Sequence, residues 1–180
     1  MDAKQQLSAG FRSALERWGE ESLEGIGIFR DKFPDFEKWK EKSIEQLRSV
    51  YSDKTIDVFL TTKDNRTIDS PDGFARFTGS CGDTMEIFLR GKNGIIMDSS
   101  FQTDGCISAQ AAGGMVIEML KGKRIDEIKE LTPQDVLDAL GGLPKENEHC
   151  ATLAIDTLKR ALDDLITRKQ ANGKEQRSRS

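Results

Sequence analysis

The hydrophobic pattern of this chain changes period twice, and this change constrains the fold more than any other feature. Between Phe74 and Phe101, apolar side chains alternate with polar ones, which is the two-residue period of half-buried strands. The pattern predicts three strands, at Phe74–Ser80, Thr84–Arg90 and Ile95–Phe101. The connections between them are too short for parallel crossovers, so neighbouring strands have to run antiparallel. The predicted sheet is therefore a three-stranded antiparallel meander.

The same alternation predicts which strand residues face the core. On the second strand, Met85, Ile87 and Leu89 share one face. On the third strand the alternation groups the following residues: Ile95, Met97, Ser99 and Phe101. A single sheet buries only one of its sides, so we expect the strand edges and the loop ends to stay accessible.

Beyond the sheet, apolar residues recur every three to four positions, which is the period of helices. Helices are predicted over four ranges: 53–62, 108–120, 132–140 and 146–168. The third of these has Thr132 as its N-cap and Pro133 at its first position, and Gly141 ends it. Three strands with helices packed against one face define an α+β fold.

The first 50 residues are predicted to form an extra N-terminal helical segment, because they carry two apolar stripes at helical spacing. The stripes are Leu7, Phe11, Leu15 and Trp18, then Phe36, Trp39, Ser43, Leu47 and Val50. Residues 169–180 are polar and basic, and we expect a disordered tail there. The chain thus divides into an extension (1–50), a domain (51–168) and a tail (169–180).

Composition excludes several classes of protein. With 180 residues, 36% of them hydrophobic, the chain is long enough for one domain with a sizeable core. Its formal charge of −4 argues against a general nucleic-acid binder, and no apolar run is long enough to predict a membrane span. The N-terminus lacks the layout of a secretory signal, and the odd number of cysteines favours a reducing compartment. We therefore expect a cytoplasmic protein.

The only three cysteines and the only histidine all lie at predicted boundaries between elements. Cys81 falls in the turn after the first strand, two residues before Asp83. Cys106 opens a helix, and Cys150 follows His149 in the first turn of the last helix. Because the positive end of a helix dipole lowers the pKa of a thiol, we expect Cys106 and Cys150 to be rich in thiolate.

Three thiols, a carboxylate and an imidazole make a complete set of soft-metal ligands. The cysteines are too far apart in sequence for a zinc ribbon, so the fold would have to bring them together at one end of the sheet. Such a shallow site suits Zn²⁺ or an iron–sulfur cluster. A cluster on three thiolates completed by an oxygen or imidazole ligand is held less firmly than one on four thiolates. A structural zinc domain that only mediates interactions stays open as an alternative.

Several motifs, in order, resemble one family. They are Tyr51-Ser52, Cys81-Gly82-Asp83, Phe101-x-Thr-x-Gly-Cys106, Met119-Leu120-Lys121-Gly122-Lys123, Leu143-Pro144 leading to His149-Cys150, and Leu158-Lys159. Together they cover about residues 51 to 168 and are similar to the iron–sulfur cluster assembly scaffold family, that is, IscU and the N-terminal domain of NifU.

The resemblance implies a scaffold and not an enzyme. A cysteine desulfurase delivers sulfur as a persulfide, an iron donor supplies iron, and a transient [2Fe–2S] cluster forms and passes to apo iron–sulfur proteins. By the family pattern, Cys81, Cys106 and Cys150 are ligands and sulfur acceptors, and Cys150 receives the persulfide first. Asp83 is a ligand that promotes release, and His149 is an alternative ligand. Zn²⁺ can occupy the same residues.

The chain departs from the family in three places. The early Asn-Pro-Arg-Asn segment is replaced by residues 62–66, and the chaperone-recognition stretch before His149 is altered at residues 145–148. The N-terminal 50 residues have no counterpart, and we expect them to pack on the domain or to pair two subunits as a homodimer. A zinc-dependent sulfur acceptor, a sulfurtransferase relative, is the second hypothesis; His149 favours the scaffold because relatives with the other role lack that histidine.

Overall fold

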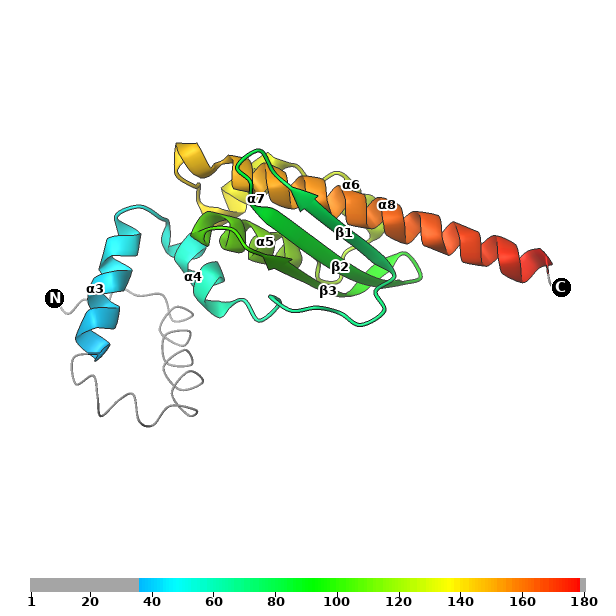
Figure 1. The fold of residues 1–180 in the computed structure, drawn as a ribbon, viewed down its shortest axis with the longest axis horizontal. Coiled ribbons are helices and arrows are strands. Elements are labelled where there is room, and N and C mark those ends of the chain that lie inside the picture. The colour runs from blue at the N-terminus through cyan, green and yellow to red at the C-terminus, as the bar shows by residue number, and fades with distance from the viewer. Residues whose placement is uncertain (1–35, 179–180) are drawn as a thin grey trace.

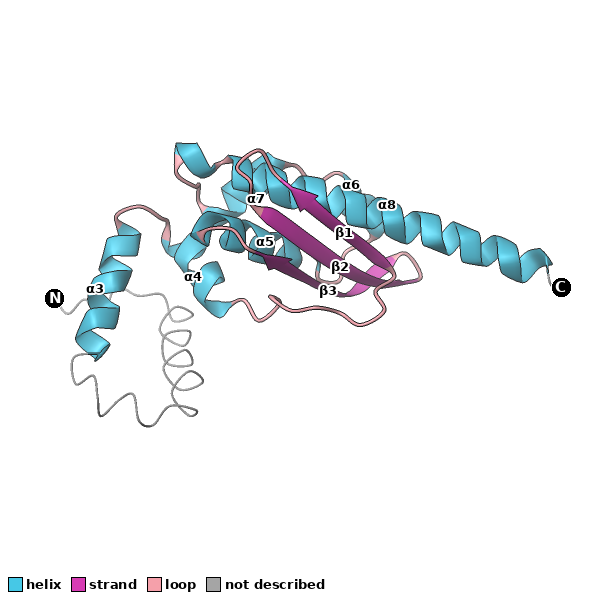
Figure 2. Ribbon diagram, in the orientation of Figure 1, coloured by secondary structure: helices cyan, strands magenta, loops and turns pink. Residues whose placement is uncertain are grey.

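The structure, a computed structural model, describes residues 36–178, so the helix expected around Leu7–Trp18 lies outside the described residues. Three strands form one antiparallel sheet in the order β1 (Gly73–Thr78), β2 (Thr84–Lys92) and β3 (Ile95–Thr103). The helices lie on one face of this sheet, which leaves the other face toward the viewer in Figures 1 and 2. The predicted α+β meander is confirmed.

Six α-helices and one 3₁₀ turn complete the described chain: α3 (Phe36–Arg48), α4 (Asp53–Thr61), α5 (Ile107–Leu120), α6 (Ile125–Lys129), α7 (Pro133–Leu140), η2 (Lys145–Asn147) and α8 (His149–Ser178). In the core layer, α8 packs on β1 and β2, while α5 packs on β3 and against α8. Among the described helices, none has both the length and the apolar character needed to cross a bilayer.

The core side of β2 is the one predicted, because Met85, Ile87 and Leu89 are fully buried. On the opposite side, the ring of Phe88 lies 5.0 Å from that of its cross-strand neighbour Phe74. Only 8% of Phe88 is exposed, so part of this face is also shielded from water.

The face predicted for the third strand is wrong at its start. Arg90 pairs with Asp98 while Gly91 pairs with Ile96, so Met97 is an extra residue in a β-bulge. The bulge reverses the alternation, which buries Ile96 and leaves Met97 64% exposed. Beyond the bulge the prediction is confirmed for Ser99 and Phe101, which are both buried.

The second helix of the predicted extension is present as α3, and it packs on α4 through a small cluster around Ile44 and Ile56. Its predicted apolar stripe ends early, because Val50 lies in the turn after the helix and is 56% exposed. In the described residues, α3 is therefore joined to the domain by packing against α4.

The last helix differs from its predicted bounds at both ends. It begins at His149 and not at residue 146, because residues 145–147 form a 3₁₀ turn after Pro144. It continues to Ser178, so most of the segment expected to be a disordered tail belongs to α8. Good helix formers such as lysine, glutamine and glutamate allow this extension, and Lys169 Nζ donates to the carbonyl oxygen of Gly91 at 2.7 Å.

Candidate metal centre

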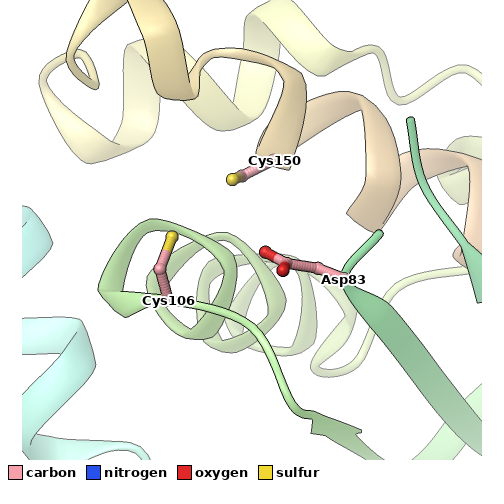
Figure 3. A group of neighbouring side chains, drawn as sticks. All are labelled: Asp83, Cys106 and Cys150. Atoms are coloured by element: carbon pink, nitrogen blue, oxygen red, sulfur yellow. The ribbon is translucent and has the colours of Figure 1, made fainter. Parts of the chain in front are cut away.

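Three elements meet at one end of the sheet and bring three potential ligands together. Asp83 comes from the turn that leads into β2, Cys106 from the start of α5 and Cys150 from the first turn of α8. One carboxylate oxygen and the two sulfur atoms all lie within 4.8 Å of one another. Figure 3 shows the three side chains directed toward a common space between their elements.

Cys106 is the N-cap residue of α5, with an extended backbone (φ −69°, ψ 179°) and no side-chain cap hydrogen bond. Its thiol is therefore free of the capping role that a serine or aspartate would take at this position. The side chain is exposed. Its position at the start of the helix agrees with the sequence prediction.

Cys150 is fully buried, and its acid–base behaviour is opposite to the prediction. Burial is the main cause that raises the pKa of the Cys150 thiol to about 12, and the nearby charges of Cys106, Cys81 and Asp83 and a hydrogen bond with Cys106 contribute to the same shift. The loss of hydration and the nearby negative charges therefore outweigh the helix N-terminus. A bound cation would reverse this balance, because metal coordination displaces the thiol proton.

His149 and Cys81 lie beside the three-ligand group. The Nε2 atom of His149 is 3.7 Å from the sulfur of Cys150, within reach of a weak hydrogen bond. Cys81 is exposed in the tight turn between β1 and β2, where Gly82 has a φ of +90°. The structure thus brings Asp83, Cys106 and Cys150 together and places the other two residues at the edge of the group.

Two hydrogen-bonded ties that the sequence analysis missed hold these segments in place. In the first, the Asp104 carboxylate accepts from the backbone N–H of Thr84 at 2.7 Å, and the Thr103 hydroxyl donates to the Thr84 carbonyl at 2.8 Å. The run Thr103-Asp104-Gly105 is typical of a side-chain-capped turn, which is the signal that could have found this tie.

In the second tie, the side-chain amide of Asn147 donates to the hydroxyl of Ser108 at 3.0 Å. Ser108 is fully buried and also donates to the hydroxyl of Tyr51 at 3.4 Å. Because Ser108 follows Cys106 and Asn147 precedes Cys150 by a few residues, this bond joins the two cysteine-bearing segments. No local sequence pattern predicts this hydrogen bond.

The residues present fit a soft cation. Ligand atoms around tetrahedral Zn²⁺ with Zn–S bonds of ~2.3 Å stand about 3.8 Å apart. The three atoms found here lie within 4.8 Å of one another, so small side-chain movements reach that geometry. Cys81 and His149 are the neighbouring candidates for a fourth ligand. Zn²⁺ or an iron atom of a cluster would bring a Lewis acid that holds thiolates and sulfide.

Comparisons with known proteins show to which family the chain belongs. The NifU-like N terminal domain family matches residues 50–172. The chain is 42% identical over 126 residues to the iron–sulfur cluster assembly scaffold protein IscU 1 of Archaeoglobus fulgidus, covering 69% of this chain and 80% of the relative. It is 35% identical over 130 residues to IscU of Escherichia coli K12, covering 68% of this chain and 98% of the relative.

Among solved structures, the fold is similar to the N-terminal part of a nitrogen-fixing NifU-like protein from Brucella abortus. The TM-score is 0.55 at 15% identity, over 67% of this chain and 97% of that structure. This likeness concerns the fold. The sequence matches decide the family, since they span most of the domain: the chain belongs to the NifU-like N-terminal domain family, the family of the IscU-type iron–sulfur cluster assembly scaffolds.

Proposed function

We propose that this protein assembles a labile [2Fe–2S] cluster on Cys81, Cys106 and Cys150 and then passes it to apo-proteins. Asp83 or His149 completes the ligand set. A cysteine desulfurase supplies sulfur, and a separate donor supplies iron. The observation that supports the proposal most is the convergence of Asp83, Cys106 and Cys150 within 4.8 Å, in a family of iron–sulfur scaffolds. As a member of that family the chain is a scaffold and not an enzyme.

Sulfur enters by exchange between a persulfide and a thiolate. The Cys150 thiolate attacks the outer sulfur of the desulfurase persulfide, the S–S bond there breaks, and the desulfurase cysteine leaves as a thiolate. Because Cys150 is fully buried, this step needs the turn at Cys81 or the start of α8 to open. Reducing each bound persulfide sulfur to sulfide then takes two electrons from an external reductant.

Release follows from the mixed ligand set. A carboxylate oxygen is a harder donor than a thiolate and exchanges more readily on iron. Asp83 is only half-buried, so an incoming acceptor thiolate can displace it first. The exposed Cys81 and Cys106 then lie on the side from which an acceptor approaches.

A zinc-dependent sulfur acceptor is the second candidate. The observation that favours it is that three ligand atoms are close enough for a single ion, while Cys81 lies outside that group. The presence of His149 beside Cys150 favours the scaffold, because the family resemblance implies that relatives with the other role lack this histidine.

The scaffold proposal also includes the setting in which the protein works. We place it in the cytoplasm, with two copies paired through the N-terminal extension, and with neither nucleic acid nor membrane as a partner. The boundary between an extension (1–50) and the domain that follows it stays a prediction. Size-exclusion chromatography with light scattering, with and without bound cluster, tests the homodimer.

Anaerobic reconstitution tests the function. The purified protein is incubated with a cysteine desulfurase, cysteine, Fe²⁺ and a reductant, and visible absorption and circular dichroism are recorded. The scaffold predicts cluster bands with about two irons and two sulfides per cluster. Sulfur uptake as persulfide with Zn²⁺ bound and no cluster bands supports the second candidate. If the protein takes up no sulfur and shows no cluster bands, the result supports a structural zinc domain.

A further inference from the structure

Gly105 lies directly before Cys106 and under the carboxylate of Asp83. A Cβ atom built at Gly105 would stand 2.7 Å from the Asp83 Oδ2 atom and 3.1 Å from its Cγ atom. Heavy atoms of side chains do not approach a Cβ atom within 3.0 Å. The carboxylate therefore occupies space that only glycine leaves open at position 105.

Asp83 has little freedom to move away with its backbone. Its carbonyl accepts from the N–H of Gly79 at 2.9 Å, which closes the turn on one side. On the other side, Thr84 is held by Asp104 and Thr103 through the hydrogen bonds described above. The Gly105 N–H donates to the Thr103 hydroxyl at 3.1 Å, so the backbone is held on both sides of the close contact and only the carboxylate can move.

We infer that Gly105 is a positioning residue: its missing side chain is what lets the Asp83 carboxylate join Cys106 and Cys150 as an oxygen ligand. The inference rests on the proposed role of Asp83 in the site. A methyl group at position 105 displaces the Asp83 carboxylate, which is the movable end of its side chain, from the group of ligands. Gly105→Ala thus converts the mixed ligand set into one without Asp83.

The contact with Asp83 can be separated from a second contact. The same Cβ atom would stand 2.6 Å from the Cβ atom of Ala109, one turn into α5. Ala109→Gly removes that neighbour, so the pair Gly105→Ala/Ala109→Gly keeps only the conflict with Asp83. Ala109→Gly alone is the matched control, because it removes the neighbour in α5 and adds no atom beside Asp83.

The experiment is a Co²⁺ titration of the metal-free full-length protein, in which thiolate charge-transfer bands and d–d bands are recorded separately. Thermal unfolding of each metal-free variant checks that it folds. Asp83→Ala and Gly105→Ala/Ala109→Gly are expected to give the same altered d–d spectrum with thiolate bands retained. Loss of a group that orients a ligand lowers metal affinity roughly 10- to 100-fold. The double variant Asp83→Ala/Gly105→Ala should bind no more weakly than either single variant.

The outcomes separate this inference from the function itself. If Gly105→Ala has the wild-type Co²⁺ spectrum and affinity while Asp83→Ala does not, the proposed role of Gly105 is overturned. Asp83 remains a ligand in that case. Recovery of wild-type binding in Gly105→Ala/Ala109→Gly also overturns it, because the effect then passes through Ala109. Wild-type binding by Asp83→Ala removes the ligand role on which the inference rests, whatever the position-105 variants do.

Discussion

Alkylation of the metal-free protein should find Cys150 far less reactive than a free thiol. With a pKa of about 12, only roughly 1 in 10⁴ of the Cys150 thiol is ionised at pH 8, against about a quarter of an ordinary thiol of pKa ~8.5. The more basic thiolate is intrinsically more nucleophilic, with a Brønsted coefficient of about 0.4–0.5, which recovers roughly a factor of 40. The net expectation is a rate about 50-fold below that of a free thiol, and burial lowers it further.

The assay is iodoacetamide labelling under a chelator, with the modified peptides quantified by mass spectrometry and an unstructured cysteine-containing peptide of thiol pKa ~8.5 as the reference. The sign of the pH dependence follows from the raised pKa. Between pH 8 and pH 10 the ionised fraction of Cys150 grows about 100-fold, whereas that of the reference thiol is nearly complete by pH 10. The gap between the two rates should therefore narrow as the pH rises. Equal rates for Cys150 and the reference peptide at pH 8 would refute the reasoning.

Three further variants test single parts of the site. Asp83→Ala should give a longer-lived cluster that transfers more slowly, because the exchangeable oxygen ligand is lost; faster loss of the visible bands contradicts this. Cys106→Ser should prevent stable assembly in the anaerobic reconstitution, and a normal cluster yield would exclude Cys106 as a ligand. Asn147→Ala removes the bond to Ser108, worth about 1 kcal/mol, and should weaken Zn²⁺ binding about fivefold in a competition titration. Unchanged Zn²⁺ affinity in that variant would show that this tie does not hold the two cysteine segments together.

Much of the fold could be predicted because local signals and tertiary packing agree. The alternation around Met85 and Ile87 and the short connections allow only an antiparallel meander, and the structure has that meander. The bulge at Met97 could not be predicted, since it depends on how β2 and β3 pair and not on the sequence of either strand. The short helix α6 was also missed, because five residues carry too little periodicity.

At the site, too, the features set by local sequence could be predicted and those set by packing of distant elements could not. The positions of Cys106 and Cys150 at helix starts could be read from the sequence, and so could Asp83 two residues beyond Cys81. The raised pKa of Cys150 could not, because it comes from burial under elements distant in sequence. The bond between Asn147 and Ser108 could not be predicted for the same reason, whereas the run Thr103-Asp104-Gly105 carried a signal for the bond through Asp104.

Cluster transfer measures the central claim most directly. Protein carrying a reconstituted cluster is separated from free iron and sulfide, then mixed with an apo-ferredoxin in the presence of a strong iron chelator, and circular dichroism follows the ferredoxin signal. A scaffold with an open, mixed-ligand site predicts that the ferredoxin gains its cluster despite the chelator, and faster than from free Fe²⁺ and sulfide. A cluster that stays on the protein, or whose iron is lost entirely to the chelator, would contradict the account.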